Sequence, residues 1–249
     1  MTNFENELIL NIQFGGLGDN LFLSPIPRLF KEKYPNGKVY LSSHSKFRSS
    51  QIKEIVWDMN PYVDGISSKS GIIPQYGLGP LKLNILSQLA HSLNVETDIN
   101  LEPEIYYKPE LIEAFSDKTL IDLNYTSFVG SFSKTRILNL LKNEPKITLI
   151  NPPKWSSGLG VSITTESLKH YIDLIYSCQK FICFTSGGAT LAASIKKPSI
   201  CLFGYGQNNI FHHSSIHQYM NVKKEDFLLN FLNSYYLRVR NKIRIHLSE

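Results

Sequence analysis

The chain alternates short apolar runs with segments whose apolar residues recur at helical spacing. Residues 7–14 (ELILNIQF) are rich in Ile and Leu and predict a buried strand. A glycine turn follows, and the apolar residues between Phe22 and Phe30 then share one face of a predicted helix, whose prolines fit only its opening turns. Residues 38–42 (KVYLS) predict the next strand. The opening of the chain therefore predicts a strand–helix–strand unit.

Similar alternation continues to the end of the second half. We expect a helix and a short strand within 49–66, a loop at 65–80, a helix at 81–93 and an extended linker near 102–109. Further strands are predicted at 119–123, 146–151, 181–184 and 199–203, with helices at 136–142, 168–175 and 189–195 and a loop at 152–161. Alternating strands and helices imply parallel sheets that helices cover on both faces. The sequence predicts an α/β protein with two Rossmann-like domains.

Composition and cysteine content narrow the class of protein. Of the 249 residues, 42% are hydrophobic and 19% are charged, which is enough apolar material for a core and argues against a disordered chain. Cys178, Cys183 and Cys201 form no CxxC pair, so buried and reduced thiols are expected. The N-terminus is acidic and carries no apolar signal segment, and no apolar run has the roughly 18 residues of a membrane helix. We expect a cytoplasmic protein.

The charge is unevenly distributed along the chain. Residues 1–115 carry 10 Lys and Arg against 13 Asp and Glu, whereas residues 116–249 carry 16 against 8. We place the domain boundary near residue 115, where the sign changes, so that the predicted domains are 1–115 and 116–249. A basic second half favours an anionic partner, which charge alone leaves open as nucleic acid, a membrane surface or a phosphorylated small molecule. The basic residues are scattered and no nucleic-acid module accompanies them, so nucleic acid is disfavoured.

The first candidate site is the glycine turn at residues 15–19 (GGLGD). A glycine turn between a strand and a helix lets the backbone approach a ligand, and the helix N-terminus favours an anion. The dinucleotide pattern GxGxxG is incomplete, because Leu21 occupies the third glycine position, and we set a nicotinamide-dependent enzyme behind the other possibilities. Asp19 has two interpretations, a simple N-cap residue or a general base that faces a cleft between the domains.

The second candidate site is residues 185–190 (TSGGAT), after a predicted strand. Two adjacent glycines allow successive amides to point at one spot and form an anion nest, and the hydroxyls of Thr185, Ser186 and Thr190 add donors. A diphosphate suits this site. A tight turn that caps a helix is an equally good interpretation of the local sequence.

Other candidates are weaker. His212, His213 and His217 have helical spacing for a metal site, but no acidic or cysteine partner lies nearby, and surface histidines are the better interpretation. Lys134 is one of several lysines that suit a phosphate, with a solvated lysine as the alternative. Residues 237–249 end a predicted amphipathic helix with basic residues, which favours packing across the domains or contact with anionic lipid.

Two segments together resemble the ADP-heptose:lipopolysaccharide heptosyltransferases of glycosyltransferase family 9. Residues 12–35 (IQFGGLGDNLFLSPIPRLFKEKYP) resemble the family's N-terminal signature, with Leu-Gly-Asp after a strand and a helix that ends in Tyr-Pro. Residues 60–64 (NPYVD) resemble its Asn-Pro-x-Val-Asp. Residues 167–204, which end in KKPSICLFG, resemble its C-terminal donor segment. The motifs span both halves of the chain in the family's order.

This resemblance implies a compact GT-B fold with two Rossmann-like domains that face a cleft. It also implies an inverting, metal-independent transfer of heptose or a related sugar from a nucleoside-diphosphate donor to a hydroxyl of a surface glycan or glycolipid, without a cofactor. Asp19 matches the family's catalytic base. The resemblance places the acceptor side of the cleft at Gly16, Gly18 and Asn20. It places donor binding at Thr185, Ser186, Gly187, Gly188, Ala189, Thr190, Lys134 and Gly204.

Two positions depart from the family. Its donor-site Asp falls on Thr185 here, and its His falls on Thr190. These changes favour a donor other than ADP-heptose, or a relative that binds a sugar nucleotide or a glycan without catalysis. We therefore keep a non-catalytic binding protein as the alternative, and we expect a location in the cytoplasm that includes peripheral contact with the inner membrane.

Overall fold

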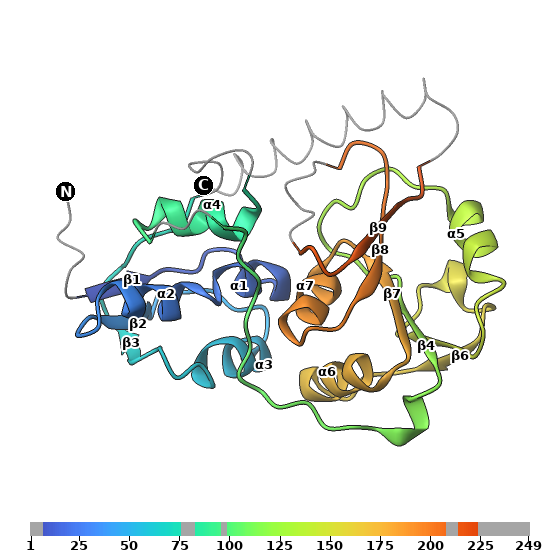
Figure 1. The fold of residues 1–249 in the computed structure, drawn as a ribbon, viewed down its shortest axis with the longest axis horizontal. Helices are drawn as coiled ribbons and strands as arrows, with labels where there is room; N and C mark the ends of the chain where they lie inside the picture. The colour runs from blue at the N-terminus through green and yellow to red at the C-terminus, as the bar shows by residue number, and fades with distance from the viewer. Residues whose placement is uncertain (1–6, 76–82, 96–98, 208–213, 224–249) are drawn as a thin grey trace.

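The computed structural model describes residues 7–75, 83–95, 99–207 and 214–223, and they form two lobes joined by a linker (Figure 1). The first lobe contains a parallel sheet in the order β1-β2-β3, and the second contains a parallel sheet in the order β6-β5-β4-β7-β8-β9. We use first lobe for residues 7–95 and second lobe for residues 119–223. The predicted α/β class is confirmed.

The strands are β1 (Glu7–Leu10), β2 (Lys38–Ser42), β3 (Gly65–Ser67), β4 (Thr119–Asp122), β5 (Ile147–Ile150), β6 (Val161–Ile163), β7 (Lys180–Phe184), β8 (Ser199–Phe203) and β9 (Gln218–Asn221). The α-helices are α1 (Leu17–Leu23), α2 (Ile26–Lys33), α3 (Ser50–Lys53), α4 (Ile85–Ser92), α5 (Lys134–Leu141), α6 (Leu168–Ser177) and α7 (Gly187–Ser194). One π-helical turn (Glu54–Asp58) follows α3, and 3-10 turns lie at Glu113–Phe115 and Lys154–Ser156.

The second sheet has the strand order of a doubly wound fold. Counted along the chain from β4, its order is 3-2-1-4-5-6, so the direction of winding reverses between β4 and β7. Alternate residues of each strand enter different cores. Leu120 joins a cluster with α6 and α7, whereas Ile121 joins a cluster with α5 on the opposite face. The sheet is therefore buried on both faces, as the alternation of strands and helices predicted.

The predicted helix over residues 22–30 is two helices. α1 ends at Leu23, and Pro25 is the N-cap residue of α2. Proline has no N–H to continue the hydrogen bonds of α1, but it fits the opening turn of a new helix. Strands β2 and β8 have the predicted bounds. The edge strands β6 and β9 were not predicted, because each is short and partly exposed.

The two lobes meet where α1 packs against α7 (Figure 1). Gly18 lies against Gly187, and a methyl group added at Gly187 would come within 3.2 Å of the Gly18 nitrogen. Small residues thus let the first turns of the two helices approach closely. One cluster of buried apolar side chains continues from β1 through both helices into β4 and β8, so the lobes share a core.

The linker fastens the lobes together along one side. Its Glu104 pairs with Arg28 of α2 at 2.6 Å, and its Tyr107 hydroxyl donates to Asp173 of α6 at 3.0 Å. The backbone N–H of Ile112 donates to Ser177 Oγ at 2.7 Å, farther along the same helix. The domain boundary near residue 115 stays a prediction. Within the described residues, no helix has the length and apolar character needed to cross a bilayer.

Candidate active site

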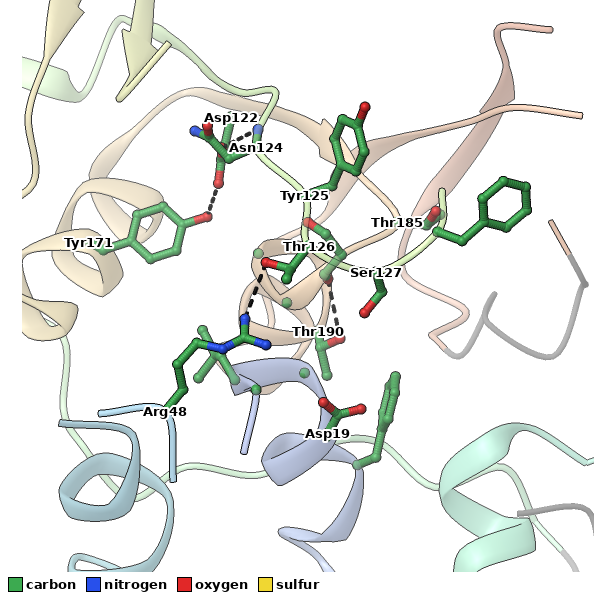
Figure 2. Close-up of a pocket in the computed structure, with 18 residues that line it drawn as sticks. Asp19, Arg48, Asp122, Asn124, Tyr125, Thr126, Ser127, Tyr171, Thr185 and Thr190 are labelled. Atoms are coloured by element: carbon green, nitrogen blue, oxygen red, sulfur yellow. Dashed lines mark hydrogen bonds between the residues drawn. The ribbon is translucent and has the colours of Figure 1, made fainter. Parts of the chain in front are cut away.

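A cavity of about 440 Å³ lies between the lobes, at the carboxyl ends of β4 and β7 (Figure 2). Open α/β sheets bind ligands at such a reversal of winding, outside the strand ends. The first lobe supplies the start of α1 and the loop after β2, and the second supplies the loops after β4 and β7. The lining residues are 16–19, 22, 48, 122, 124–128, 171, 185–188 and 190.

Asp19 is half-buried and lines this cavity from the third position of α1. The N-cap residue of α1 is Gly16, so the N-cap interpretation of Asp19 is wrong. A methyl group added at Gly16 would lie 2.7 Å from Asp19 Oδ2, which shows that the carboxylate turns back over this glycine. A carboxylate in the first turn of a helix is stabilised as an anion by the helix dipole.

Arg48 comes to the cavity from the loop after β2. The Arg48 N–H donates to the Gly15 carbonyl at 2.9 Å, and a methyl group at Gly15 would lie 2.8 Å from the Arg48 nitrogen. Gly15 is thus the residue that lets this loop lie against the turn before α1. The guanidinium donates to Thr126 Oγ1 at 3.2 Å, across the space between the lobes (Figure 2). Among the described residues of the lining, Arg48 is the one arginine or lysine.

The N-terminus of α7 forms the floor of the cavity on the second lobe. Ser186 is the N-cap residue, and its side chain makes no capping hydrogen bond with any described residue. The N–H groups of Gly187 and Gly188 lie in the first turn of the helix, where no intrahelical acceptor exists. This end of the helix carries a partial positive charge. The arrangement therefore suits an anion, as the sequence predicted.

The loop after β4 adds hydroxyl groups that the sequence interpretation missed. Thr126 and Ser127 line the cavity near the end of α7, and Figure 2 shows them between Tyr125 and Thr190. Their position follows from the fold, because β4 and β7 are neighbours and their carboxyl ends open onto the same cavity. A hydroxyl-rich loop directly after a buried strand is the signal that would have identified them.

A buried carboxylate lies beneath the start of α7. Asp122, the last residue of β4, accepts hydrogen bonds from the Tyr171 hydroxyl at 2.5 Å, from the Asn124 N–H at 2.9 Å and from Asn124 Nδ2 at 2.8 Å. Burial raises the pKa of Asp122, and these hydrogen bonds oppose the rise. Burial and the adjacent carboxylate raise the pKa of Tyr171 well above its usual value. The sequence predicted Tyr171 only as part of the helix at 168–175.

Eight of the predicted site residues line the cavity together, namely Gly16, Gly18, Asp19, Thr185, Ser186, Gly187, Gly188 and Thr190. The Thr185 hydroxyl donates to Gln207 Oε1 at 2.6 Å, and the Thr190 hydroxyl donates to the Ser186 carbonyl at 3.4 Å. These two hydroxyls are thus engaged by the protein itself. The rest of the lining was not predicted as site residues and consists of Leu17, Phe22, Arg48, Asp122, Tyr171 and residues 124–128 of the loop after β4.

Four predicted site residues lie outside the lining, and packing accounts for each. Asn20 is buried, donates to the Gly16 carbonyl at 2.8 Å and accepts from Trp57 Nε1 at 2.7 Å. Ala189 is buried in the shared core. Lys134 begins α5, where its ammonium lies 5.7 Å from the ring centre of Trp155 and lines a separate cavity of residues 130–135. Gly204 lies against Gly130 and Ser131, where an added methyl group would meet backbone atoms at 2.5–2.6 Å.

The histidine site considered from the sequence is only partly covered by the structure. His217 is buried, and its Nε2 lies 3.0 Å from the Ala189 carbonyl. Burial lowers the pKa of His217. His212 and His213 lie outside the described residues. No group of three His, Cys, Asp or Glu side chains in the described part of the chain is placed to hold a metal ion.

Comparison with solved structures identifies the fold. A family 9 glycosyltransferase from Veillonella parvula aligns with a TM-score of 0.63 and 11% identity, over 97% of this chain and 90% of that one. The ADP-heptose lipopolysaccharide heptosyltransferase II of E. coli aligns at 0.59 and 10% identity, over 86% and 90%. The E. coli heptosyltransferase WaaC, solved with ADP, aligns at 0.55 and 11% identity, over 87% and 93%.

The chain thus has the GT-B fold of the family 9 glycosyltransferases, and the predicted fold is confirmed. No family model matches the sequence, and no curated protein matches it. At such low identity the likeness describes the fold and not the chemistry. The activity therefore depends on the residues of the cavity.

Proposed function

We propose that this protein is a glycosyltransferase that moves a sugar from a nucleoside-diphosphate donor to a hydroxyl group of a glycan. The observation that carries the proposal is that Asp19 and the N-terminus of α7 line one cavity from opposite lobes of a GT-B fold. Transfer of a sugar from a diphosphate leaving group requires a base for the acceptor hydroxyl on one side and an anion site for the diphosphate on the other.

In this proposal Asp19 accepts the proton of the acceptor hydroxyl while that oxygen attacks the anomeric carbon. The bond from the anomeric carbon to the diphosphate oxygen breaks through an oxocarbenium-like transition state, and the electron pair leaves with the diphosphate. One attack from the face opposite the leaving group inverts the anomeric configuration. Asp19 is half-buried on the first-lobe side, opposite the anion site, which supports this direction of attack.

The charge that develops on the leaving diphosphate has to be stabilised, and the cavity offers three kinds of donor. The Gly187 and Gly188 amides lie at the positive end of α7. Thr126 and Ser127 supply hydroxyls, and Arg48 supplies a positive charge from the other lobe. These groups support a transfer that does not depend on a metal ion, and we expect turnover to persist in the presence of EDTA.

Room for the nucleoside supports a sugar-nucleotide donor. A second cavity of about 410 Å³ adjoins the first and shares Leu17, Asp122, Asn124 and Tyr171 with it. The solved relatives named above include one with ADP and one named for ADP-heptose and lipopolysaccharide, which supports heptose or a related sugar and a surface-glycan acceptor. Contact with an anionic membrane would involve residues 237–249, which lie outside the described residues. That contact and the cytoplasmic location stay predictions.

The alternative is a sugar-nucleotide or glycan-binding protein without catalysis. The observation that favours it is that Thr185 and Thr190, which occupy the positions of the family's Asp and His, direct their hydroxyls to Gln207 and to the Ser186 carbonyl. Both hydroxyl protons are thus directed to acceptors within the protein. Binding of a sugar nucleotide without transfer to any offered acceptor would favour this alternative.

The test begins with a thermal-shift screen of ADP-, GDP-, UDP- and CMP-sugars, because a ligand that binds the native state raises its melting temperature. With the donor found, transfer to glycan acceptors is followed by chromatography for the wild type and for Asp19→Asn. We expect the variant to lose transfer by about 10²–10⁴-fold with donor binding nearly unchanged. The matched control is Asp58→Asn, a carboxylate of the same lobe that pairs with Lys53 outside the cavity. Full activity of Asp19→Asn would refute the base assignment.

A further inference from the structure

Asp122 and Tyr171 have no role in the proposed transfer reaction, although they lie beside the proposed diphosphate site. A methyl group added at Gly188 would lie 2.5 Å from the Tyr171 hydroxyl oxygen and 3.4 Å from Asp122 Oδ2. Both groups are therefore packed against the first turn of α7, which is the proposed diphosphate site. Both line the main cavity (Figure 2), and both also line the adjoining cavity.

The protonation state of this pair sets the direction of its hydrogen bond. Asp122 as a carboxylate can only accept, so the Tyr171 hydroxyl is committed to it at 2.5 Å. A protonated Asp122 donates instead to the Tyr171 oxygen, and the Tyr171 proton is then free for another acceptor. The other carboxyl oxygen keeps its hydrogen bonds from Asn124 in either state.

A bound diphosphate would change which state is favoured. It would place negative charge beside a carboxylate that is already buried, and two like charges in one site raise the proton affinity of the one that can titrate. This repulsion favours proton uptake by Asp122.

We propose that Asp122 and Tyr171 are a proton-coupled hydrogen-bond switch of the diphosphate site. When a diphosphate binds, Asp122 takes up one proton from solvent and donates to the Tyr171 oxygen, and the Tyr171 hydroxyl turns to donate to a phosphate oxygen. Tyr171 is thereby a binding residue for the diphosphate and Asp122 is its positioning residue. The inference rests on the proposed function in one respect, that a diphosphate binds at α7.

Asp122 is the group of this pair and its packed neighbours that can change its protonation state near neutral pH. Tyr171 faces it from α6 and Cys183 is its register partner on β7, and burial raises the pKa of both, so that both are neutral near pH 7. The start of α7 contributes only glycines there. Across the cavity the first lobe presents Arg48 and Asp19, and Glu166 lines the adjoining cavity.

The experiment is calorimetric titration of the full chain with inorganic pyrophosphate, and separately with ADP, GDP and UDP. Each titration is run near neutral pH in buffers of different ionisation enthalpy, which yields the protons taken up on binding. Asp122→Asn mimics the protonated state, because its amide nitrogen donates to Tyr171 while its oxygen still accepts from Asn124. Tyr171→Phe removes the proposed donor.

We expect the wild type to take up more protons than Asp122→Asn, by as much as about one. Asp122→Asn should bind pyrophosphate at least as tightly as the wild type above pH 7, whereas Tyr171→Phe should bind about tenfold more weakly. A merely structural pair would instead weaken binding in both variants. The ligand's own ionisation is common to all three proteins and cancels in the comparison.

Equal proton uptake by the wild type and Asp122→Asn would overturn the switch, as would unchanged affinity in Tyr171→Phe. If Asp122→Asn does not fold, Tyr171→Phe decides, since an unchanged affinity for pyrophosphate in that variant overturns the inference. If the wild type binds none of the four ligands, the proposed function fails and the inference falls with it. Binding with equal proton uptake in the wild type and Asp122→Asn refutes only the switch.

Discussion

Gly188→Ala is the substitution whose effect on the stability of the fold follows most directly from the structure. The new methyl carbon would lie 2.5 Å from the Tyr171 hydroxyl oxygen, whereas non-bonded atoms are best separated by about 3.5 Å. The next nearest atoms, Asp122 Oδ2 at 3.4 Å and Phe181 Cζ at 3.7 Å, are ordinary contacts. The hydroxyl would therefore have to move by about 1 Å, away from a hydrogen bond that measures 2.5 Å.

The expected loss of stability combines three effects. Overpacking a dense interior costs about 1–3 kcal/mol, and a hydrogen bond to a charged group is worth about 1.5–3 kcal/mol. Alanine in place of glycine within a helix stabilises the folded state by about 0.5–1 kcal/mol and so offsets part of this loss. We expect Gly188→Ala to lower the free energy of unfolding by about 1.5–5.5 kcal/mol, measured by urea denaturation. Gly158→Ala is the control, because an added methyl group there meets no atom within 4 Å.

A double-mutant cycle shows whether Tyr171 is the origin of the cost. Tyr171→Phe removes the oxygen that collides, so Gly188→Ala should cost little more in a chain that already carries Tyr171→Phe. We expect the double variant to be more stable than the sum of the single effects by at least about 1.5 kcal/mol. Strict additivity would refute the reasoning, because it would mean that the two substitutions act at separate sites.

Two further predictions concern charge. Arg48→Gln should weaken pyrophosphate binding about tenfold and reduce the dependence of this binding on salt, because it removes the one lysine or arginine among the described lining residues. The control is Lys46→Gln, which removes an exposed cation of the same loop and should change neither the affinity nor its salt dependence. An unchanged affinity in Arg48→Gln would place the diphosphate elsewhere. Asp64 is the second case. Burial alone would raise its pKa, but hydrogen bonds from Lys31, a backbone amide and Lys38 outweigh burial and lower the pKa of Asp64 to about 2. A lowered carboxyl pKa stabilises the fold above the unfolded value of 3.8, and that contribution disappears as the pH falls toward about 2. Asp64→Asn should therefore be less stable than the wild type at pH 6, and the difference should shrink as the pH falls through about 2. A difference that keeps its full pH 6 size at pH 2 would contradict this account.

Local sequence patterns were sufficient for the parts of the fold that depend on near neighbours in the chain. The strands at Lys38–Ser42 and Ser199–Phe203 are apolar runs between turn residues, and both have the predicted bounds. The glycine turns at Gly15 and Gly187 were found because glycine between a strand and a helix is a strong local signal. Where two signals competed, as at Pro25, the proline divided the apolar stripe into two helices.

The composition of the cavity was decided by tertiary structure. Arg48, Thr126 and Tyr171 come from three segments far apart in the chain, and they meet because parallel strands open at one edge and because the lobes pack through Gly18 and Gly187. Asn20 and Ala189 lie next to cavity residues in sequence but point into the core. By itself, the sequence determined the alternation of strands and helices, Asp19 and the amides of α7. Only packing decided which other side chains face the cavity, since a helix turns each successive residue by about 100° and the local pattern does not record what lies opposite.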